Sequence, residues 1–443
     1  MHWDRLICDK RFGLENYHDP RQSSRSDFQR DYDRLVFSSP FRRLQNKTQV
    51  FPLPGSIFVH NRLTHSIEVA CVGRSMAREV SRALRVKYAG EPWVDKLYDI
   101  GDIVAAACLA HDLGNPPFGH SGEKAISTFF SEGAGQILRD ELSADQWTDL
   151  IHFEGNANAF RVLTHQFKGR RPGGFAMTYS TLASIVKYPY ESSLAVKANK
   201  FGFFTSETAD FVKVADEVGL IRRPDVDGVS YCRHPLVYLV EAADDICYEI
   251  MDIEDAHKLR LLTTDEVMGL FLGFFDADRQ EHMHRIMAGV DDPNEKIGYL
   301  RSCVIGTLVN RCAEAFIANE EAILAGTFSG VLLDHVPALE RDGYARCNEM
   351  SWAKLYRASD VVEIELAGNR IITFLLEKLI HAVRFPQLNY SQLLLSKVPQ
   401  QYDVSAPTLF GKVQAVLDHI SAMTDVYALD LYRKLLGMSL PAV

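Results

Sequence analysis

The amino-acid sequence predicts an all-α protein with one small β-hairpin and a helical C-terminal extension. Apolar residues recur at helical spacing along most of the 443 residues, as in the run from Ile103 to Leu113. A hairpin is predicted where two short runs flank the turn-forming segment 224–228. After Asp255 one amphipathic pattern follows another, without an internal repeat or a low-complexity segment.

Composition indicates a large packed core and argues against some classes of protein. Hydrophobic residues make up 47% of the chain and charged residues 24%, which is typical of a globular protein. The length allows two or three domains or one large helical body. Acidic residues outnumber basic ones, 58 to 48, which argues against a generally basic nucleic-acid-binding protein. An anionic substrate would therefore need a local basic pocket.

The sequence predicts a cytoplasmic protein without a membrane partner. Residues 1–10 are charged and lack the apolar core of a signal peptide, and the longest apolar runs are too short to span a bilayer. The eight cysteines have no C-x-x-C spacing, and several, such as Cys108 and Cys247, lie in helical apolar stripes. We therefore expect reduced cysteines in the core.

The helices are predicted from their apolar spacing and their end signals. Ser38 precedes Pro40 and begins one helix, and the dipeptide His234-Pro235 begins another. Helices are predicted over residues 28–37, 67–86, 103–113, 157–163 and 181–186. The later helices follow from shared apolar faces, which are formed by Val304, Leu308, Cys312 and Phe316, by Ile372, Leu375, Leu376, Leu379 and Val383, and by Val413, Val416, Leu417 and Ile420.

The most informative stretch is residues 107–123, ACLAHDLGNPPFGHSGE. It places His111 and Asp112 at the end of an apolar helix, which a glycine and two prolines then stop. Ser121 can cap a following helix with Glu123 in its first turn. A lone histidine on such a face is more often a core residue bonded to a carbonyl than a metal ligand. Two other segments change that interpretation.

Both segments add polar residues that are aimed at a buried position. His65 lies at the start of an amphipathic helix and shares its apolar face, while Asp244, Tyr248 and Asp252 recur at i, i+4 and i+8. Burying such a ladder without an ion or a ligand would be costly. Two histidines and two aspartates from three helices suit a divalent ion, without selecting among Mn, Fe, Co, Ni, Zn and Mg. Of the adjacent Asp244 and Asp245 we choose Asp244, because it shares the face of Tyr248.

The order His65, His111-Asp112 and Asp244 resembles the H…HD…D signature of the HD superfamily of metal-dependent phosphohydrolases, and this resemblance implies the HD-domain helical fold. Longer words resemble the deoxyguanosine triphosphate triphosphohydrolase family. They are Arg42–Phe51 (RRLQNKTQVF), Asn61–His65 (NRLTH), His111–Glu123 (HDLGNPPFGHSGE), Phe153–Ala157 (FEGNA) and Glu241–Tyr248 (EAADDICY). The C-terminal third is similar to the family mainly at Ala367–Ile372 (AGNRII).

The resemblance implies a division of the chain and an activity. Residues 1–60 would form an N-terminal segment with candidate nucleotide contacts, residues 61–260 an HD phosphohydrolase core, and residues 261–443 a C-terminal helical region. The implied enzyme hydrolyses deoxynucleoside triphosphates, dGTP first among them, to the deoxynucleoside and tripolyphosphate. Its implied cofactor is one divalent ion per active site, which is Mn, Mg or another transition metal.

The resemblance also assigns roles to individual residues. His65, His111, Asp112 and Asp244 would hold the metal ion. His120 and Glu123 would form a catalytic pair, in which Glu123 orients His120 while His120 protonates the leaving 5′ oxygen. The implied substrate contacts are Gln45 for the base, Arg62, Lys187, Tyr188 and Lys200 for the phosphates, and Tyr248 and Asp252 for the sugar. From their spacing alone, Lys187 and Lys200 could equally be ordinary surface lysines.

Two alternative functions remain open on the sequence. One is another HD phosphohydrolase that acts on nucleoside monophosphates, cyclic nucleotides or alarmones. The other is a nucleotide-sensing or single-strand-binding regulator, although a sensor would not need His120 and Glu123 beside a complete set of metal ligands. The resemblance further implies a homo-oligomer, with a hexamer among its forms, and single-stranded DNA as a candidate regulator.

Overall fold

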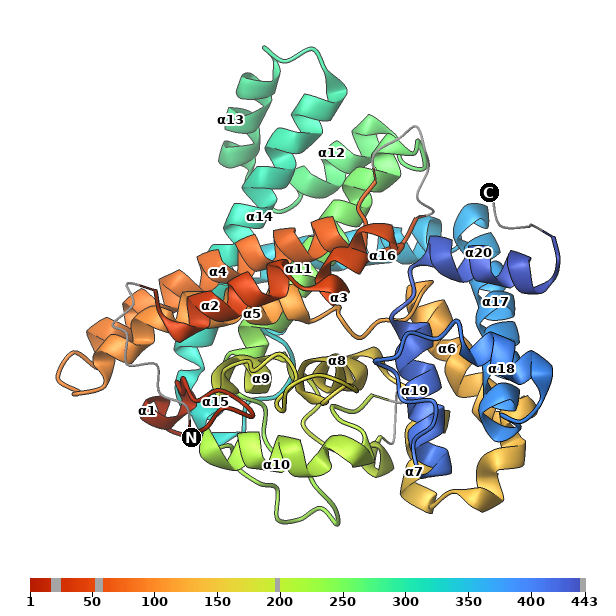
Figure 1. The fold of residues 1–443 in the computed structure, drawn as a ribbon. Coiled ribbons are helices and arrows are strands. Elements are labelled where there is room, and N and C mark those ends of the chain that lie inside the picture. Colours follow the sequence, from red (N-terminus) through yellow and green to blue (C-terminus); the bar gives the residue numbers. More distant parts are fainter. Residues whose placement is uncertain (17–24, 52–58, 196–199, 439–443) are drawn as a thin grey trace.

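The computed structural model shows a protein built from helices (Figure 1). The structure describes residues 1–16, 25–51, 59–195 and 200–438. The all-α prediction is confirmed, because β-structure in this part of the chain is limited to isolated bridges, such as the antiparallel bridge between Arg222 and Tyr231. The hairpin predicted around segment 224–228 is therefore not confirmed as a pair of strands.

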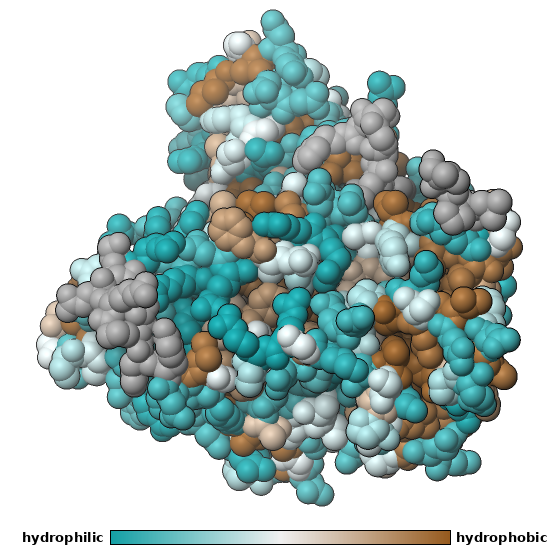
Figure 2. Space-filling model, viewed as in Figure 1, coloured by the Kyte–Doolittle hydropathy of each residue, from teal (hydrophilic) through white to brown (hydrophobic). Residues whose placement is uncertain are grey.

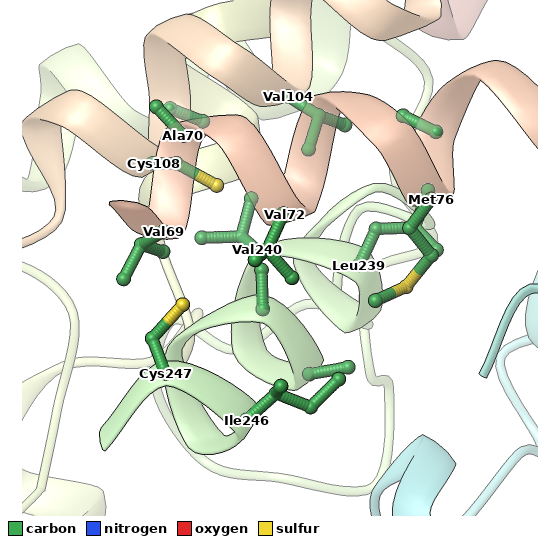
Figure 3. Packing of buried hydrophobic residues seen from close by; sticks show 14 of the residues in the cluster. Val69, Ala70, Val72, Met76, Val104, Cys108, Leu239, Val240, Ile246 and Cys247 are labelled. Carbon is green, nitrogen blue, oxygen red and sulfur yellow. The ribbon is translucent and has the colours of Figure 1, made fainter. Parts of the chain in front are cut away.

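Three helices form the centre of the molecule: α4 (Arg62–Lys87), α5 (Ile100–Ala110) and α11 (Val237–Lys258). Asn61 caps α4, and its side chain accepts a hydrogen bond from the backbone N–H of Thr64 in a capping box. The facing sides of the three helices interlock through buried apolar residues (Figure 3), among them Val69, Val72, Met76, Val104, Cys108, Leu239, Ile246 and Cys247. This packing holds the predicted metal-binding segments against one another.

Further helices surround this centre. In the N-terminal half they are α1 (Trp3–Leu6), α2 (Asp27–Val36), α3 (Ser39–Arg43), α6 (Gly119–Ser131), α7 (Ala144–Ile151), α8 (Gly155–Thr164), α9 (Tyr179–Ile185) and α10 (Thr208–Glu217). Short 3₁₀ helices cover Leu44–Asn46, Val94–Asp99, Ala134–Glu141, Ser192–Leu194, Thr205–Glu207 and Leu332–His335, and a π-helical turn covers Ser351–Leu355.

The remaining helices form two groups (Figure 1). One group, part of which projects at the top of the view, comprises α12 (Thr264–Leu272), α13 (Ala277–Met287), α14 (Pro293–Ala318), α15 (Glu320–Ala325) and α16 (Ala338–Met350). The other lies beside α6 and α7 and comprises α17 (Ser359–Arg384), α18 (Asn389–Leu395), α19 (Leu409–Ser421) and α20 (Asp425–Leu435).

Most predicted helices are confirmed, with ends shifted by a few residues. The apolar faces predicted for the later helices are buried on α14, α17 and α19. The helix predicted over 103–113 instead begins at Ile100 and ends at Ala110. His111 and Asp112 therefore lie in the turn that follows α5, where the chain is redirected by a glycine and two prolines.

The helix after that turn also differs from its prediction. α6 begins at Gly119, and Ser121 lies inside its first turn instead of capping it. The Ser121 hydroxyl donates to the carbonyl oxygen of Glu365 on α17, 2.8 Å away. Phe118, just before α6, has a left-handed φ of 64°, and its backbone N–H donates to Asp425. At its start, α6 thus has no side-chain cap and instead makes hydrogen bonds to the C-terminal helices.

The apolar side chains form two cores. The larger core joins α2, α4, α5, α9, α11 and α14, and the smaller core joins α6 and α7 to α17, α18 and α19. Figure 2 shows apolar residues exposed on the right of the view, over the C-terminal helices, while the rest of that face is mostly hydrophilic.

The division of the chain into three parts at residues 60 and 260 stays a prediction. No helix in the described ranges is long and apolar enough to cross a membrane.

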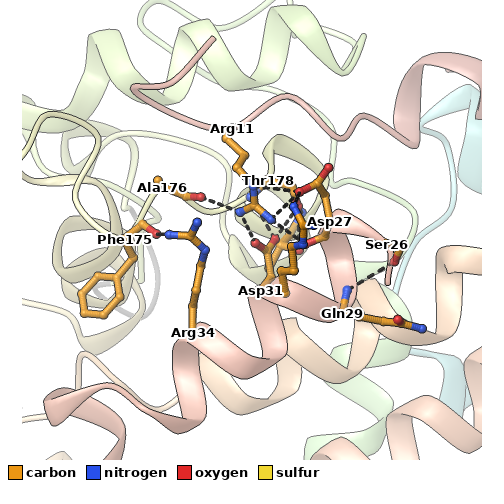
Figure 4. A network of polar contacts seen from close by, with 11 residues as sticks. Arg11, Ser26, Asp27, Gln29, Asp31, Arg34, Phe175, Ala176 and Thr178 are labelled. Carbon is orange, nitrogen blue, oxygen red and sulfur yellow. Dashed lines mark hydrogen bonds and ion pairs between the residues drawn. The ribbon is translucent and has the colours of Figure 1, made fainter. Parts of the chain in front are cut away.

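A polar network ties the N-terminal segment to the body of the protein (Figure 4). The Arg11 guanidinium donates to Asp31 at 2.7 Å and to the carbonyl oxygen of Ala176 at 2.7 Å. The other carboxylate oxygen of Asp31 accepts from the Thr178 hydroxyl at 2.6 Å. Arg34 on α2 donates to the Phe175 carbonyl oxygen at 3.2 Å. These bonds join α2 to the loop before α9 and so help to place the following segment, residues 39–51, beside the central helices.

Candidate active site

A cluster of possible metal ligands lies where α4, α5 and α11 meet. His65, His111 and Asp244 each offer one ligand atom, and these atoms lie within 4.8 Å of one another. The Asp244 Oδ1 atom is 3.0 Å from His65 Nε2 and 3.4 Å from His111 Nε2. Of the two adjacent aspartates, the structure thus brings Asp244 into the cluster, as the helix face predicts. The geometry can hold a cation through imidazole and carboxylate ligands.

The state of His111 supports a cation in this cluster. Its Nδ1 atom is 2.5 Å from the Cys108 carbonyl oxygen, which is the contact that orients a metal-binding imidazole and leaves Nε2 as the ligand atom. That Nε2 atom is buried and has no hydrogen-bond partner among the described residues. Burial would lower the pKa of His111, but Asp112 and Asp244 raise it to about 9. The surroundings therefore favour a positive charge, which a divalent ion would supply.

Asp112, the fourth predicted ligand, lies beside the cluster but bonds to other groups. Its Oδ2 atom accepts a hydrogen bond from Arg62 at 2.9 Å, and its Oδ1 atom, which accepts from Asn115, is 3.6 Å from His111 Nε2. Burial opposes ionisation, but Arg62, His111 and His65 hold the pKa of Asp112 below its usual value. The carboxylate therefore stays ionised next to the other three side chains.

A cavity of about 320 Å³ opens over the cluster. It is lined by ten residues predicted to act at the site, namely Arg62, His111, Asp112, His120, Glu123, Lys187, Tyr188, Lys200, Asp244 and Tyr248. Four further residues line it that were not predicted as site residues, namely Gln49, Asn115, Asn156 and Asp245. This cavity is thus lined by residues of α4, α6 and α11 and of the loops around α9.

The three cationic side chains of this cavity are each paired with a carboxylate. Arg62 bonds to Asp112, as described above. Lys187 Nζ lies 3.1 Å from Glu241, and Lys200 Nζ lies 2.5 Å from Glu154 and 3.7 Å from Glu123. These carboxylates raise the pKa values of Lys187 and Lys200 against the effect of burial, so both ammonium groups stay charged. Tyr188 lies with its ring centroid 5.9 Å from Lys187 Nζ.

Arg62 is held close to the start of α6 by the shape of the backbone there. Gly119 has a left-handed φ of 55°, and a Cβ atom at this position would lie 2.4 Å from the guanidinium of Arg62. A larger residue would therefore be strained and would also clash with Arg62. The glycine in the predicted turn thus lets the first residue of α4 approach the cavity.

His120 and Glu123 both lie on the cavity wall, but no hydrogen bond joins them. Glu123 is buried, and its Oε1 atom accepts from the backbone N–H of Gly155 at 2.9 Å while its other oxygen faces Lys200. A Cβ atom on Gly155 would lie 2.4 Å from Glu123, so only glycine allows this approach. The predicted orientation of His120 by Glu123 is therefore not seen. His120 is solvent-accessible, and its partial desolvation, with Arg62 and Lys200, lowers its pKa.

Gln45 does not lie where the resemblance placed it. It is exposed in the 3₁₀ helix after α3 and does not line the cavity. Gln49 lines the cavity instead, and its buried Oε1 atom has no hydrogen-bond partner among the described residues. Both glutamines occur in the word RRLQNKTQVF, so the sequence contained the right segment. The turn of the 3₁₀ helix, which spacing alone does not reveal, decides which glutamine faces inward.

Asp252 also differs from its prediction. Its side chain is buried and does not line the cavity. It accepts a hydrogen bond from the hydroxyl of Tyr356 at 3.2 Å, and burial raises its pKa well above the usual value. Tyr356 in turn stacks on Tyr248, which does line the cavity. Tyr356 lies in the C-terminal region, where the sequence carried no signal for the site.

The comparisons with known proteins agree with this geometry. A model of the HD domain matches residues 62–187, which include His65, His111 and Asp112, and a model of the phosphohydrolase-associated domain matches residues 341–434. The chain is 38% identical to a deoxyguanosinetriphosphate triphosphohydrolase-like protein of Pseudomonas aeruginosa over the full length of both proteins. A protein of the same name from Synechocystis is 37% identical over 99% of this chain and all of the relative.

A third relative has the same name without the words "like protein". The deoxyguanosinetriphosphate triphosphohydrolase of Yersinia enterocolitica is 30% identical and covers 93% of this chain and 94% of its own. Identity at this level over nearly the whole length, together with the HD-domain match and the His-Asp cluster, leaves one assignment. The chain belongs to the deoxyguanosinetriphosphate triphosphohydrolase-like family of the HD superfamily, and it is a hydrolase.

Proposed function

We propose that this hydrolase acts on deoxynucleoside triphosphates, with dGTP as the favoured substrate, and releases the deoxynucleoside and tripolyphosphate in a reaction that needs a divalent metal ion. The observation that carries this proposal is the cavity that His111 and Asp244 of the cluster line together with three cationic side chains. The names of the relatives, which specify dGTP and triphosphate hydrolysis, support the same substrate and reaction.

The metal ion would be held by His65, His111, Asp112 and Asp244. The bare Nε2 atom of His111 and the ionised carboxylate of Asp244 fit this role best. A divalent cation bound there would act as a Lewis acid and lower the pKa of a water molecule, and Mn, Mg or another transition metal would satisfy the ligand types. Asp112 would need to share its carboxylate between the ion and Arg62.

The triphosphate would be bound by Arg62, Lys187 and Lys200. Each of these cations is now paired with a protein carboxylate, so the substrate would compete for charges that the fold already holds in position. Charge-assisted hydrogen bonds to phosphate oxygens are strong, and fixed donors need little reorganisation. Tyr188 beside Lys187 would complete this wall of the cavity.

His120 would donate the proton to the leaving 5′ oxygen. In the free protein its pKa is lowered, so the imidazole is mainly neutral at neutral pH. The negative charge of a bound triphosphate would raise that pKa, because an opposite charge nearby favours the protonated form. The substrate itself would thus favour the acid form of His120 that protonates the leaving group.

Tyr248 would select the deoxy sugar. It follows Asp244 by one helical turn, or ~6 Å along the axis of α11, and it lines the same cavity. With the α-phosphate near Asp244, the sugar would lie over the Tyr248 ring, which leaves little room for a 2′-hydroxyl. Asp252 would support this ring through Tyr356 and would not touch the 3′-hydroxyl. Gln49 would take the base contact that the resemblance gave to Gln45.

Several expectations rest on the resemblance alone and stay predictions. They concern the homo-oligomer and its hexameric form, single-stranded DNA as a regulator, the cytoplasmic location and the native metal ion. The alternative of a nucleotide sensor is less favoured, because His120 is accessible in the cavity as a reactive acid should be.

Product analysis tests the proposed function. The protein is incubated with dGTP and either Mn²⁺ or Mg²⁺, and the products are separated by anion-exchange chromatography. Deoxyguanosine and tripolyphosphate in equal amounts are the expected products. Formation of dGMP with pyrophosphate, or of dGDP with phosphate, would show a different phosphohydrolase. Turnover that persists after chelation of divalent ions would contradict the proposed metal dependence, and faster turnover of another dNTP would contradict the preference for dGTP.

A further inference from the structure

A second cavity, of about 100 Å³, lies where α3 and α8 approach α19. Its lining includes Arg43, Lys47, Asn158, Arg170, Tyr402 and Ser421. It shares no lining residue with the active-site cavity. The two cavities are therefore separate sites, although Lys47 also donates to the backbone carbonyl of Asn115, which lines the first cavity.

The lining of the second cavity contains more basic than acidic side chains. Arg43, Lys47 and Arg170 line it, and the carboxylate in its lining is that of Asp418. Both oxygens of Asp418 already accept hydrogen bonds from Arg161, at 2.8 and 2.9 Å. Arg43 makes no hydrogen bond or ion pair within the described part of the chain. Burial lowers the pKa of Arg43, with Arg170 adding to that effect.

Two buried donors also have hydrogen-bonding capacity left. Lys47 is 2% exposed, and its ammonium donates to the carbonyl oxygens of Asn115 and Ser421, at 2.6 and 2.7 Å. An ammonium has three N–H donors, so one is still available. The hydroxyl of Ser421 is buried, on a residue that is 3% exposed, and has no hydrogen-bond partner among the described residues. Burial lowers the pKa of Lys47 to about 7, against the opposing effect of the Asp425 carboxylate.

We propose that this cavity binds a phosphate-type oxyanion between Arg43, Lys47 and Ser421. The forked N–H groups of a guanidinium match two oxygens of a phosphate, and a hydroxyl and an ammonium supply single donors to the others. Such an anion would satisfy the buried donors and neutralise the local charge at once. The chain has a net charge of −10, so this basic cavity is a local feature rather than part of a generally basic surface.

The anion can come from two sources that share this chemistry. One is free inorganic phosphate, and the other is the terminal phosphate group of a polyphosphate chain. The cavity is small, so we expect a single phosphate group to enter it, with any remaining chain directed to solvent past Arg170. Arg170 is an exposed residue at this cavity, which suits it for contact with such a chain.

Isothermal titration calorimetry of Arg43→Ala against Arg42→Ala tests the proposal. Arg42 is the exposed neighbour in the same helix and does not line either cavity. Arg42→Ala therefore removes the same charge as Arg43→Ala without changing the proposed site. Inorganic phosphate and tripolyphosphate are titrated separately into each full-length variant and into the wild type. We expect Arg43→Ala to weaken binding of at least one anion by about tenfold or more, and Arg42→Ala to leave it unchanged. Arg43→Lys should restore part of the loss.

The outcomes separate the two sources and can overturn the proposal. Loss of phosphate binding in Arg43→Ala identifies free phosphate as a ligand, and loss confined to tripolyphosphate identifies a polyphosphate chain. Equal affinities of Arg42→Ala and Arg43→Ala for both anions would overturn the site, because neither variant alters the active-site cavity. If circular dichroism shows that Arg43→Ala does not fold, Ser421→Ala replaces it, with an expected loss of about threefold. An unchanged affinity in that variant would then overturn the proposal.

Discussion

The ring of Tyr356 stacks on the ring of Tyr248, with centroids 5.9 Å apart and planes inclined by 26°. The Tyr356 hydroxyl also donates to Asp252, one helical turn beyond Tyr248 on α11. Tyr356 follows the π-helical turn Ser351–Leu355, and such turns occur often at functional sites. One residue of the C-terminal region thus supports the side chain that we propose for sugar recognition.

The first prediction concerns this aromatic pair. Tyr248→Ala should lower the ratio of kcat/KM for dGTP over GTP by about tenfold or more, because it opens the space that a 2′-hydroxyl would need. Tyr356→Leu should lower the ratio in the same direction but less, since Tyr248 stays in place without its stacking partner. Tyr356→Phe is the matched control, because it keeps the stacking and loses only the hydroxyl. An unchanged ratio in Tyr248→Ala would rule out the steric explanation.

The second prediction concerns the metal ligands. His111→Ala should abolish turnover and reduce the metal content measured by elemental analysis, because it removes a buried imidazole whose Nε2 atom has no other partner among the described residues. His282→Ala, on an exposed position of α13, controls for the loss of a histidine as such. Full metal occupancy in His111→Ala would show that the ion binds elsewhere.

The third prediction concerns the proposed acid. His120→Ala should bind metal and dGTP normally but turn over about a hundredfold more slowly, which is the scale expected of a general acid. The loss should appear in kcat rather than in KM, because in the proposed reaction His120 would contact the leaving group and not the triphosphate chain. Near-normal turnover in a metal-loaded variant would place the proton donor on another residue.

The fourth prediction separates Glu123 from His120. Glu123 contacts Gly155 and Lys200, not His120, so Glu123→Gln should mainly raise KM by disturbing Lys200, the cation that we propose for phosphate binding. The pH dependence of kcat should stay unchanged, because the imidazole keeps its surroundings. If Glu123→Gln shifts the pH profile of kcat as much as His120→Ala does, then Glu123 acts on His120 after all.

The fifth prediction concerns stability at the other end of α11. His60 bonds to Asp255 at 2.7 Å and to Glu68 at 3.1 Å, and although burial lowers its pKa, these carboxylates raise it to about 10. A raised pKa means that protonated His60 stabilises the folded state fully below pH ~6.5, the unfolded value, and that this contribution disappears as pH rises through about 10.

Urea unfolding of His60→Gln checks this expectation. At pH 6 the variant should lose about 3 kcal/mol of unfolding free energy, which is the usual scale for breaking a buried ion pair. The difference from the wild type should shrink steadily between pH 7 and pH 10. A difference that is independent of pH would mean that His60 stabilises the fold by packing alone.

The sequence by itself determined the helices and the residues that converge on the cation cluster. Apolar spacing decides which face of a helix is buried, and His65 is buried on α4 while Asp244 lies half-buried on α11. His111 follows an almost wholly apolar helix that must pack at the centre. Polar residues that lie on these central helices, or directly follow one of them, are brought close together when the helices pack, and this is why local pattern could find them.

Only the tertiary structure decided which neighbouring polar side chains reach the cavities. Gln49 lines the active-site cavity, whereas Gln45 lies in the 3₁₀ helix Leu44–Asn46 and does not, and spacing does not specify that helix. Tyr356 stacks on a residue more than a hundred positions away, Tyr248, and Arg43 lines its cavity together with Tyr402, which is also distant in the sequence. Periodicity acts within one helix, whereas these contacts depend on how separate helices pack, so they could not be read from the sequence.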